Sequence, residues 1–364
     1  MKFTCNQQDL IKKLNIISKA ISSRTTIPTL KGILMDVSGN SLKMTSSDMD
    51  ITIESSMDVD VEEEGSVVVP YKLFGDFIRK LPNDDIEFTS INNNINVKCR
   101  NSNASIVGMD GNEFPIITNN GENANKLILQ KEILSKMIKN TSFAASIDQT
   151  KGVLSGILIE IENDHIRTVA IDGFRMAINT ENSTNEAKEK FIISSRLMNE
   201  INKIFSEVEE EEVEFYYDEK GILVVIDNTR ISLRMIAGEF IKYQDIIPKD
   251  SSISIKIKRQ EIIDAIERAS IMTEGKNNLV KFNISDSILT VSSNSEEGGS
   301  IEEVLIQKDG DNLEIGFNAR YMLDVLKVIS DEEIIMKMNT PITPCLITPI
   351  EGDSYIYLVL PVRI

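Results

Sequence analysis

The side chains that usually perform catalysis are scarce in this sequence. Its one histidine, His165, lies in the hairpin-like stretch NDHIRT, where we expect an exposed turn residue. The three cysteines, Cys5, Cys99 and Cys345, are scattered and lack CxxC spacing, so neither a zinc site nor a disulfide framework is predicted. No triad can be assembled without a second base, no glycine-rich phosphate loop occurs, and nothing singles out a carboxylate pair. We therefore expect a non-catalytic binding protein without a cofactor or a metal.

Basic side chains offer a different chemistry, because they recur at one spacing. Pairs seven residues apart are Lys12 and Lys19, Lys72 and Arg79, Arg196 and Lys203, and Arg320 and Lys327. Seven residues is nearly two helical turns, so each pair lies on one face of a helix. A solvated face is the common explanation for any single pair. Repeated in several helices, together with Lys136 and Lys139, the pattern favours phosphate contacts and sequence-independent DNA binding.

These basic faces belong to helices that the sequence predicts at a regular interval. The predicted helices are residues 6–21, 71–81, 130–146, 195–207, 258–271 and 318–331. Their starts repeat about every 60 residues, which is the signature of a repeated architecture. Alternating runs such as ISIKIK and ILVVI predict strands around them. We expect six strand-helix-strand units, paired into three domains.

Polar segments divide the chain between these pairs of units. NNGENAN, at residues 119–125, and PKDSS, at residues 248–252, are predicted linkers. We expect domains at residues 1–120, 126–248 and 252–364. The predicted fold class is α+β, with three similar domains that each pack two helices on antiparallel sheets.

Charge is unevenly distributed. The chain has 39 basic and 57 acidic residues, for a formal charge of -18, which alone argues against a nucleic acid partner. The six predicted helices, however, hold 16 Lys and Arg against 10 Asp and Glu. An acidic exterior would keep DNA on the positive helices.

No apolar run approaches the roughly 18 residues of a membrane helix, and the start lacks a signal peptide, so we expect a cytoplasmic protein.

Four stretches, in order, give the chain a family likeness: TIPTLKGIL, VAIDGFRMAI, GEFIKYQDIIP and LVLPVRI. With them the sequence resembles the beta sliding clamps of bacterial DNA polymerase III, over residues 1–364. The resemblance implies a head-to-tail homodimer that closes into a ring of six domains, with helices lining the hole. It implies a processivity factor that encircles duplex DNA, is opened by an ATP-driven clamp loader, and catalyses no reaction.

The resemblance also implies a pocket, between the second and third domains, that takes short partner peptides. Implied partners are the DNA polymerase III alpha subunit, the clamp loader, other replication and repair polymerases, and ligase or mismatch-repair proteins. The matching positions are Leu154, Ile171, Gly173, Phe174, Arg175, Met176, Ile241, Ile246, Ile342, Pro344, Leu358, Leu360, Pro361, Val362 and Arg363. An apolar cleft with a few polar groups suits this task, and Arg175 and Arg363 are expected to donate to a peptide carboxylate or carbonyl.

Two further sets of positions follow from the same likeness. Arg24 and Lys151 match DNA-contacting loops, although Gly152 and Val153 replace a tyrosine-rich version of the second loop. Ile106, Ile271 and Met272 match apolar contacts of the ring interface, with intradomain core as an equal alternative.

Three pocket positions depart from the family pattern. Phe174 stands where a histidine is common, Ile241 replaces a proline, and Asp245 lies where an arginine can occur. A negative Asp245 is expected to disfavour acidic peptides.

Two other functions compete with the sliding clamp. One is an acidic scaffold protein that binds peptides and never touches DNA, and the other, less favoured, is a hydrolase. The C-terminal run YIYLVLPVRI is expected to be both a closing strand, at residues 355–359, and a wall of the pocket.

Overall fold

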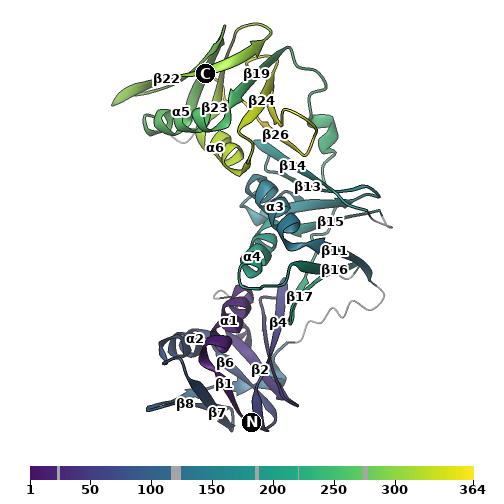
Figure 1. Ribbon diagram of the computed structural model, residues 1–364, viewed down its shortest axis with the longest axis vertical. Helices are drawn as coiled ribbons and strands as arrows, with labels where there is room; N and C mark the ends of the chain where they lie inside the picture. Colours follow the sequence, from purple (N-terminus) through teal and green to yellow (C-terminus); the bar gives the residue numbers. More distant parts are fainter. Residues whose placement is uncertain (23–24, 116–123, 185–187, 220, 274–277) are drawn as a thin grey trace. The chain divides into compact units, whose positions relative to one another are not determined.

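Every predicted helix is present, and each begins directly after a strand (Figure 1). The computed structural model describes residues 1–22, 25–115, 124–184, 188–219, 221–273 and 278–364. The helices are α1 (Gln7–Ile17), α2 (Tyr71–Lys80), α3 (Lys131–Thr141), α4 (Ser195–Phe205), α5 (Arg259–Ile271) and α6 (Ala319–Val328). The strands that precede them are β1 (Lys2–Asn6), β6 (Gly65–Pro70), β11 (Asn125–Gln130), β15 (Glu189–Ser194), β19 (Ile253–Lys258) and β23 (Leu313–Asn318). The predicted repetition of strand and helix is thus confirmed.

Helix starts agree with the predictions to within one residue, whereas some ends come earlier. Asn6 and Asn318 cap α1 and α6 because their side chains accept hydrogen bonds from backbone N–H groups of the first turn. Two predicted helices end in a tighter turn, since 3-10 turns at Ser18–Ala20 and Ser142–Ala144 follow α1 and α3.

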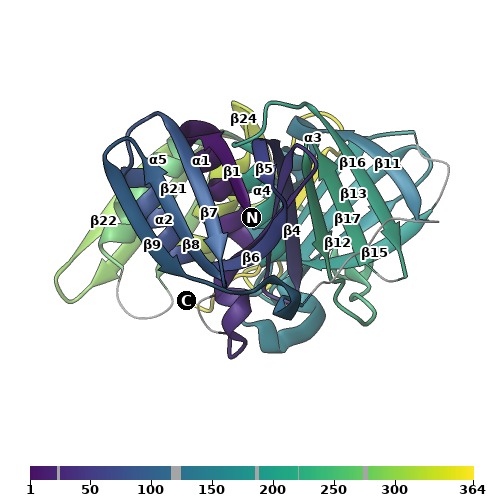
Figure 2. The same ribbon diagram turned by 90° about the horizontal axis from the view of Figure 1, so that it is seen from below.

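The described residues form two compact units. The first comprises Met1–Leu134 with Glu200–Met235. Its smaller sheet has the order β5-β1-β7-β8-β9, in which the further strands are β5 (Asp60–Glu63), β7 (Asp85–Ile91), β8 (Asn94–Cys99) and β9 (Ser102–Val107) (Figure 2). Its larger sheet has the order β10-β6-β2-β3-β4-β18-β17-β16-β11. The strands not yet named are β10 (Met109–Asp110), β2 (Gly32–Ser38), β3 (Ser41–Ser47), β4 (Ile51–Asp58), β18 (Thr229–Leu233), β17 (Gly221–Ile226) and β16 (Glu212–Asp218).

One strand pair in the larger sheet joins two of the repeats. β4 pairs with β18, with Ile53 opposite Ile231, and a buried hydrogen bond of 2.9 Å links the hydroxyls of Ser55 and Thr229. The first and second repeats therefore share a continuous sheet.

The second unit comprises Ser135–Asn199 with Ile236–Ile364 and has one twelve-stranded sheet. Its order is β15-β12-β13-β14-β26-β25-β24-β19-β22-β21-β20-β23. The strands not yet named are β12 (Gly156–Ile161), β13 (His165–Ile171), β14 (Arg175–Asn182), β26 (Tyr355–Val359), β25 (Cys345–Thr348), β24 (Glu333–Met338), β22 (Gly298–Asp309), β21 (Ile288–Ser295) and β20 (Leu279–Ser285). The predicted C-terminal strand is confirmed as β26, and it joins the second repeat to the third by pairing with β14.

All strand pairs among the described residues are antiparallel, and helices pack on the sheets, so the predicted α+β class with three similar repeats is confirmed. The domain bounds stay a prediction.

His165 differs from the expectation of an exposed turn residue. It is the first residue of β13, its side chain is half-buried, and its Nδ1 lies 2.7 Å from Oδ1 of Asp164. Within the described part of the chain, no helix is long and apolar enough to cross a membrane.

Aromatic rings fill the space between α2 and the five-stranded sheet. Phe88 on β7 is fully buried, stacks on Phe3 with ring centroids 4.7 Å apart, and lies 6.0 Å from Phe74 of α2. Such a ring contributes through its large buried area and its stacking geometry.

We expect Phe88→Ala to lower the local unfolding free energy of this sheet by about 3–5 kcal/mol, because it leaves a cavity between the rings of Phe3 and Phe74. Ile91→Ala is the control, since Ile91 lies on the same strand but is 62% exposed. Native-state hydrogen exchange of β7 and β8 amides measures both effects. Equal protection in the two variants would contradict this account of the core.

Candidate functional site

The residues of the predicted pocket lie close together in the second unit. β14 pairs with β26, which places Met176 opposite Leu358. Beyond the strands, the backbone N–H of Leu360 donates to the carbonyl of Phe174 at 2.9 Å. Ile171, Met176 and Leu358 are buried in one apolar cluster, on which Leu154 and Leu360 pack while half-buried. The structure therefore brings the base of the predicted pocket together.

Around this base, several apolar side chains face solvent. Phe174, Ile241, Ile246 and Ile342 are exposed by 53%, 41%, 39% and 84%. Pro344, Pro361 and Val362 are half-buried, and Gly173, Asp245 and Arg363 are exposed. Exposed large apolar residues beside a buried apolar base are typical of a binding surface.

A tight turn holds Phe174 outward. Gly173 has a φ of +95°, in the region that favours glycine. Oδ1 of Asp172 accepts hydrogen bonds from the backbone N–H groups of Phe174 and Arg175, at 2.8 and 3.0 Å. The Phe174 ring then stacks on Tyr321 of α6, with centroids 5.8 Å apart. Sequence reasoning missed Tyr321, because a tyrosine in the first turn of a helix carries no signal of its own.

The structure corrects the expectation for Arg175. Its side chain is 7% exposed, and all three of its nitrogens donate within the protein: Nε to Asp172 at 3.1 Å, Nη2 to the carbonyl of Phe143 at 2.7 Å, and Nη1 to Asp324. The guanidinium also lies over the Tyr321 ring, 4.6 Å from its centroid. Arg175 therefore fixes the turn of Phe174 against α6, and its burial leaves little of the guanidinium accessible to a peptide. Arg363, which is exposed, keeps the expected role as a prediction.

The basic residues of the helices lie away from the core, as predicted. The exposed ones are Lys12, Lys72, Arg79, Lys136, Lys139, Arg196, Lys203, Arg320 and Lys327, and Lys19 is half-buried. Lys151 is exposed in the 3-10 segment Gln149–Ser155. Arg24 lies outside the described residues. That these side chains contact DNA stays a prediction.

Sequence reasoning missed the acidic partners of these basic residues. Three helices carry an acid three residues before the base: Asp9 and Lys12 at 3.9 Å, Asp76 and Arg79 at 3.8 Å, and Glu200 and Lys203 at 2.9 Å. Lys136 pairs with Glu181 at 2.8 Å, Lys327 with Glu267 at 2.7 Å, and Arg320 with Asp324 at 4.0 Å. Exposed pairs of this kind contribute about 0–1 kcal/mol each, so an incoming phosphate can replace the acid.

The three predicted interface residues differ in their surroundings. Ile106 on β9 is 3% exposed and lies opposite the buried Ile95 on β8, so the alternative of intradomain core is correct for it. Its neighbour Val107, which was not predicted, is 75% exposed. Ile271 and Met272, at the end of α5, are exposed by 76% and 39%. These two keep the interface role as a prediction.

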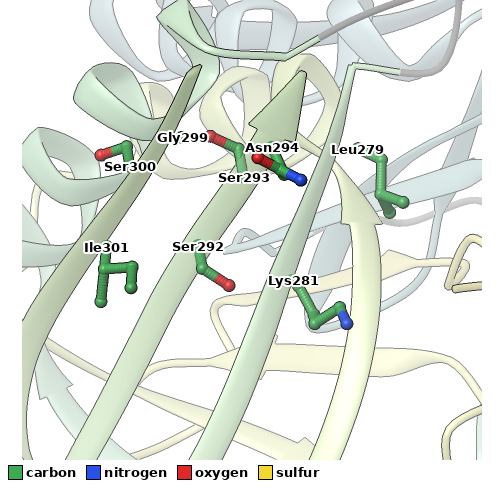
Figure 3. Close-up of a pocket in the computed structure, with 8 residues that line it drawn as sticks. All are labelled: Leu279, Lys281, Ser292, Ser293, Asn294, Gly299, Ser300 and Ile301. Carbon is green, nitrogen blue, oxygen red and sulfur yellow. The ribbon is translucent and has the colours of Figure 1, made fainter. Parts of the chain in front are cut away.

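A surface cavity of about 530 Å³ lies on β20, β21 and β22 (Figure 3). Lys281, Ser292 and Ile301 stand in register across these strands and line it. Oγ of Ser293, another lining residue, donates to the carbonyl of Ala269 at 2.6 Å. Ser293 therefore ties β21 to the last turn of α5, where Ile271 is exposed.

Comparison with known proteins covers the chain from end to end. Three domain families of the DNA polymerase III beta subunit match it in succession: the N-terminal domain over residues 1–118, the central domain over 128–242 and the C-terminal domain over 244–363. The beta sliding clamps of Staphylococcus epidermidis and Staphylococcus aureus are 30% and 31% identical to it. Each alignment is 377 positions long and covers 100% of this chain and 99% of the relative.

Solved structures agree with these relatives. A DNA polymerase III beta subunit from Eubacterium rectale has a TM-score of 0.95 at 31% identity, covering all of both chains. The DNA polymerase sliding clamp from Bacillus subtilis has a TM-score of 0.95 at 29% identity, covering 100% of this chain and 99% of its own. Because these likenesses extend over the whole sequence, the chain belongs to the DNA polymerase III beta subunit family, the beta sliding clamps.

Proposed function

We propose that this DNA sliding clamp works as a closed ring of two identical chains, joined head to tail, that encircles duplex DNA and tethers a polymerase to its template. It acts in the cytoplasm without catalysing a reaction, and an ATP-driven loader opens it. Each chain contributes three domains, at residues 1–120, 126–248 and 252–364. The observation that carries the proposal is the recurrence of exposed basic residues on helices that each follow a strand.

The ion pairs on these helices suit a protein that slides. A phosphate that displaces Asp9 from Lys12 or Asp76 from Arg79 gains little net attraction over the pair that it replaces. Contacts of Lys and Arg with phosphates carry no base preference. The DNA is therefore held by topology, and the helices supply a weak, sequence-independent attraction.

The apolar surface around Leu360 and Phe174 is the proposed site for partner peptides. Burial of a peptide's apolar side chains on Leu154, Ile171 and Met176 would supply affinity, and Phe174 stacked on Tyr321 offers an aromatic wall. Arg363 can donate to a peptide carbonyl or carboxylate, whereas Asp245 disfavours an acidic residue nearby. Proposed users are the polymerase III alpha subunit, the clamp loader, and other replication and repair polymerases, ligase or mismatch-repair proteins.

Ring closure is proposed to bury the exposed apolar residues at the end of α5. Ile271 and Met272 would meet the first domain of the other chain, where Val107 on the edge strand β9 is the exposed apolar neighbour. Large exposed apolar residues at sheet edges and helix ends are typical of an association surface.

We expect DNA retention to depend on a closed circle and on the basic faces. Loaded onto nicked circular DNA with its loader and ATP, the clamp should stay bound and then leave when the circle is cut, as measured by gel filtration. Reversal to Glu at Lys12, Lys72, Arg196 and Arg320 should abolish retention and processive synthesis without changing peptide affinity. A matched control is reversal at Lys43, Lys98, Lys188 and Lys249, which changes net charge equally. Retention that survives cutting, or an unaffected helix variant, would contradict the proposal.

We expect Leu360→Ala combined with Arg363→Ala to weaken binding of a labelled peptide that carries the clamp-binding segment of the polymerase III alpha subunit. The loss should be at least tenfold, which corresponds to about 1.4 kcal/mol, because an apolar contact and a charged donor both disappear. Fluorescence anisotropy measures the affinity. Ile350→Ala, at the other end of the β25–β26 hairpin, is the control. Unchanged affinity in the double variant would refute the site.

We expect Ile271→Asp to convert the dimer into single chains of 40.8 kDa at micromolar concentration, as measured by light scattering. Burying a carboxylate in an apolar interface is strongly unfavourable, and the exposed side chain leaves the fold of the single chain intact. Ile350→Asp is the control for an exposed isoleucine elsewhere. A wild-type protein that is already a single chain under these conditions would exclude the ring.

A further inference from the structure

A buried polar cluster lies beneath the segment that carries Ile241 and Ile246. At its centre is Glu160 of β12, which is 4% exposed. Its Oε1 accepts a hydrogen bond from Nζ of Lys190 at 2.6 Å, and its Oε2 accepts one from the Tyr243 hydroxyl. Nη1 of Arg167 lies 3.8 Å from the same Oε2 and donates to the tyrosine oxygen at 3.4 Å. Buried groups of this kind contribute most when all are satisfied.

Tyr243 belongs to this polar cluster and to the apolar base of the pocket at once. It is 2% exposed, and it lies in the same apolar cluster as Ile171, Met176 and Leu358. Burial, together with the hydrogen bond to Glu160, raises the pKa of Tyr243 to about 12. The hydroxyl therefore remains a donor to the carboxylate at neutral pH.

The rest of the segment has little other anchorage. Across residues 237–246, Tyr243 is the one buried side chain, and Phe240 is half-buried. Its backbone hydrogen bonds are local: the N–H of Tyr243 donates to the carbonyl of Ile241, and the N–H of Asp245 donates to the carbonyl of Lys242. Tyr243 stands between the two exposed isoleucines, so its position determines where both are presented.

We propose that Tyr243 and Glu160 are positioning residues for partner binding, because their hydrogen bond holds Ile241 and Ile246 in place as a preformed wall of the pocket. The inference rests on the proposed peptide site and adds residues that contact no peptide. Order imposed before binding removes part of the entropy loss that binding otherwise incurs. Lys190 and Arg167 lie beside the buried carboxylate and serve as its polar partners.

Tyr243→Phe is the primary test, since it keeps the ring in the apolar cluster and removes only the hydroxyl. We expect its affinity for the labelled alpha-subunit peptide to fall about tenfold, while dimerisation and retention on circular DNA stay at the wild-type level. Glu160→Gln, which retains an acceptor for the hydroxyl, should bind better than Glu160→Ala. Lys188→Met is the matched control, because Lys188 pairs with Glu162 at 2.7 Å and is not a partner of Glu160, so this variant should bind as wild type.

A second readout separates positioning from general stability. The chain contains no tryptophan, so Gln244→Trp, at an exposed position between the two isoleucines, reports on this segment alone. In that background, Tyr243→Phe should lower the time-resolved anisotropy of the indole, and the thermal midpoint of unfolding should change little. Wild-type peptide affinity in Tyr243→Phe, or lower affinity with unchanged indole anisotropy, would overturn the inference.

Leu360→Ala with Arg363→Ala serves as the reference in the same assay. If that double variant binds the peptide normally, the site itself is misplaced. If it loses binding while Tyr243→Phe and Glu160→Ala do not, the site stands and the positioning role is wrong.

Discussion

Antiparallel pairing between strands of different repeats is the interaction on which the rest of the fold depends. β4 with β18, and β14 with β26, extend the sheets across repeats that are far apart in sequence. A strand edge with unpaired backbone groups would otherwise remain at each of these places. The second pairing also creates the pocket base, because it sets Met176 opposite Leu358 and brings Leu360 to the carbonyl of Phe174. The geometry of the proposed peptide site thus depends on sheet continuity.

Much of this fold could be predicted from the sequence because its signals are local and repeated. Apolar spacing and the interval between helix starts placed α1 to α6 to within a residue at their beginnings, since strand and helix periods differ clearly. The basic spacing likewise predicted exposed faces. The pocket positions, in contrast, came from family likeness, since Ile171 and Leu358 have no local pattern that distinguishes a site from a core.

What could not be predicted depends on three-dimensional neighbours. Arg175 was expected to donate to a peptide, yet its side chain is buried and donates to Asp172, Asp324 and the Phe143 carbonyl. Ile106 was assigned to an interface, although alternation along β9 turns it inward and Val107 outward. One face of such a strand is buried and the other faces solvent. A shift of one residue in the predicted alternation exchanges the two faces, and the sequence alone does not determine which face is buried. The acids beside the basic residues were visible in sequence, but their distances were not.

The position of β26 has a consequence for how the protein is made. Its residues are synthesised long after those of β14, with which it pairs. Contacts between segments this distant in sequence form late, because a long loop must close first. Until then β14 has an open edge, which is the kind of surface that chaperones cover and that promotes misassembly. Neither this strand pairing nor the wall that β26 contributes to the proposed peptide site can form before Tyr355–Val359 have been synthesised.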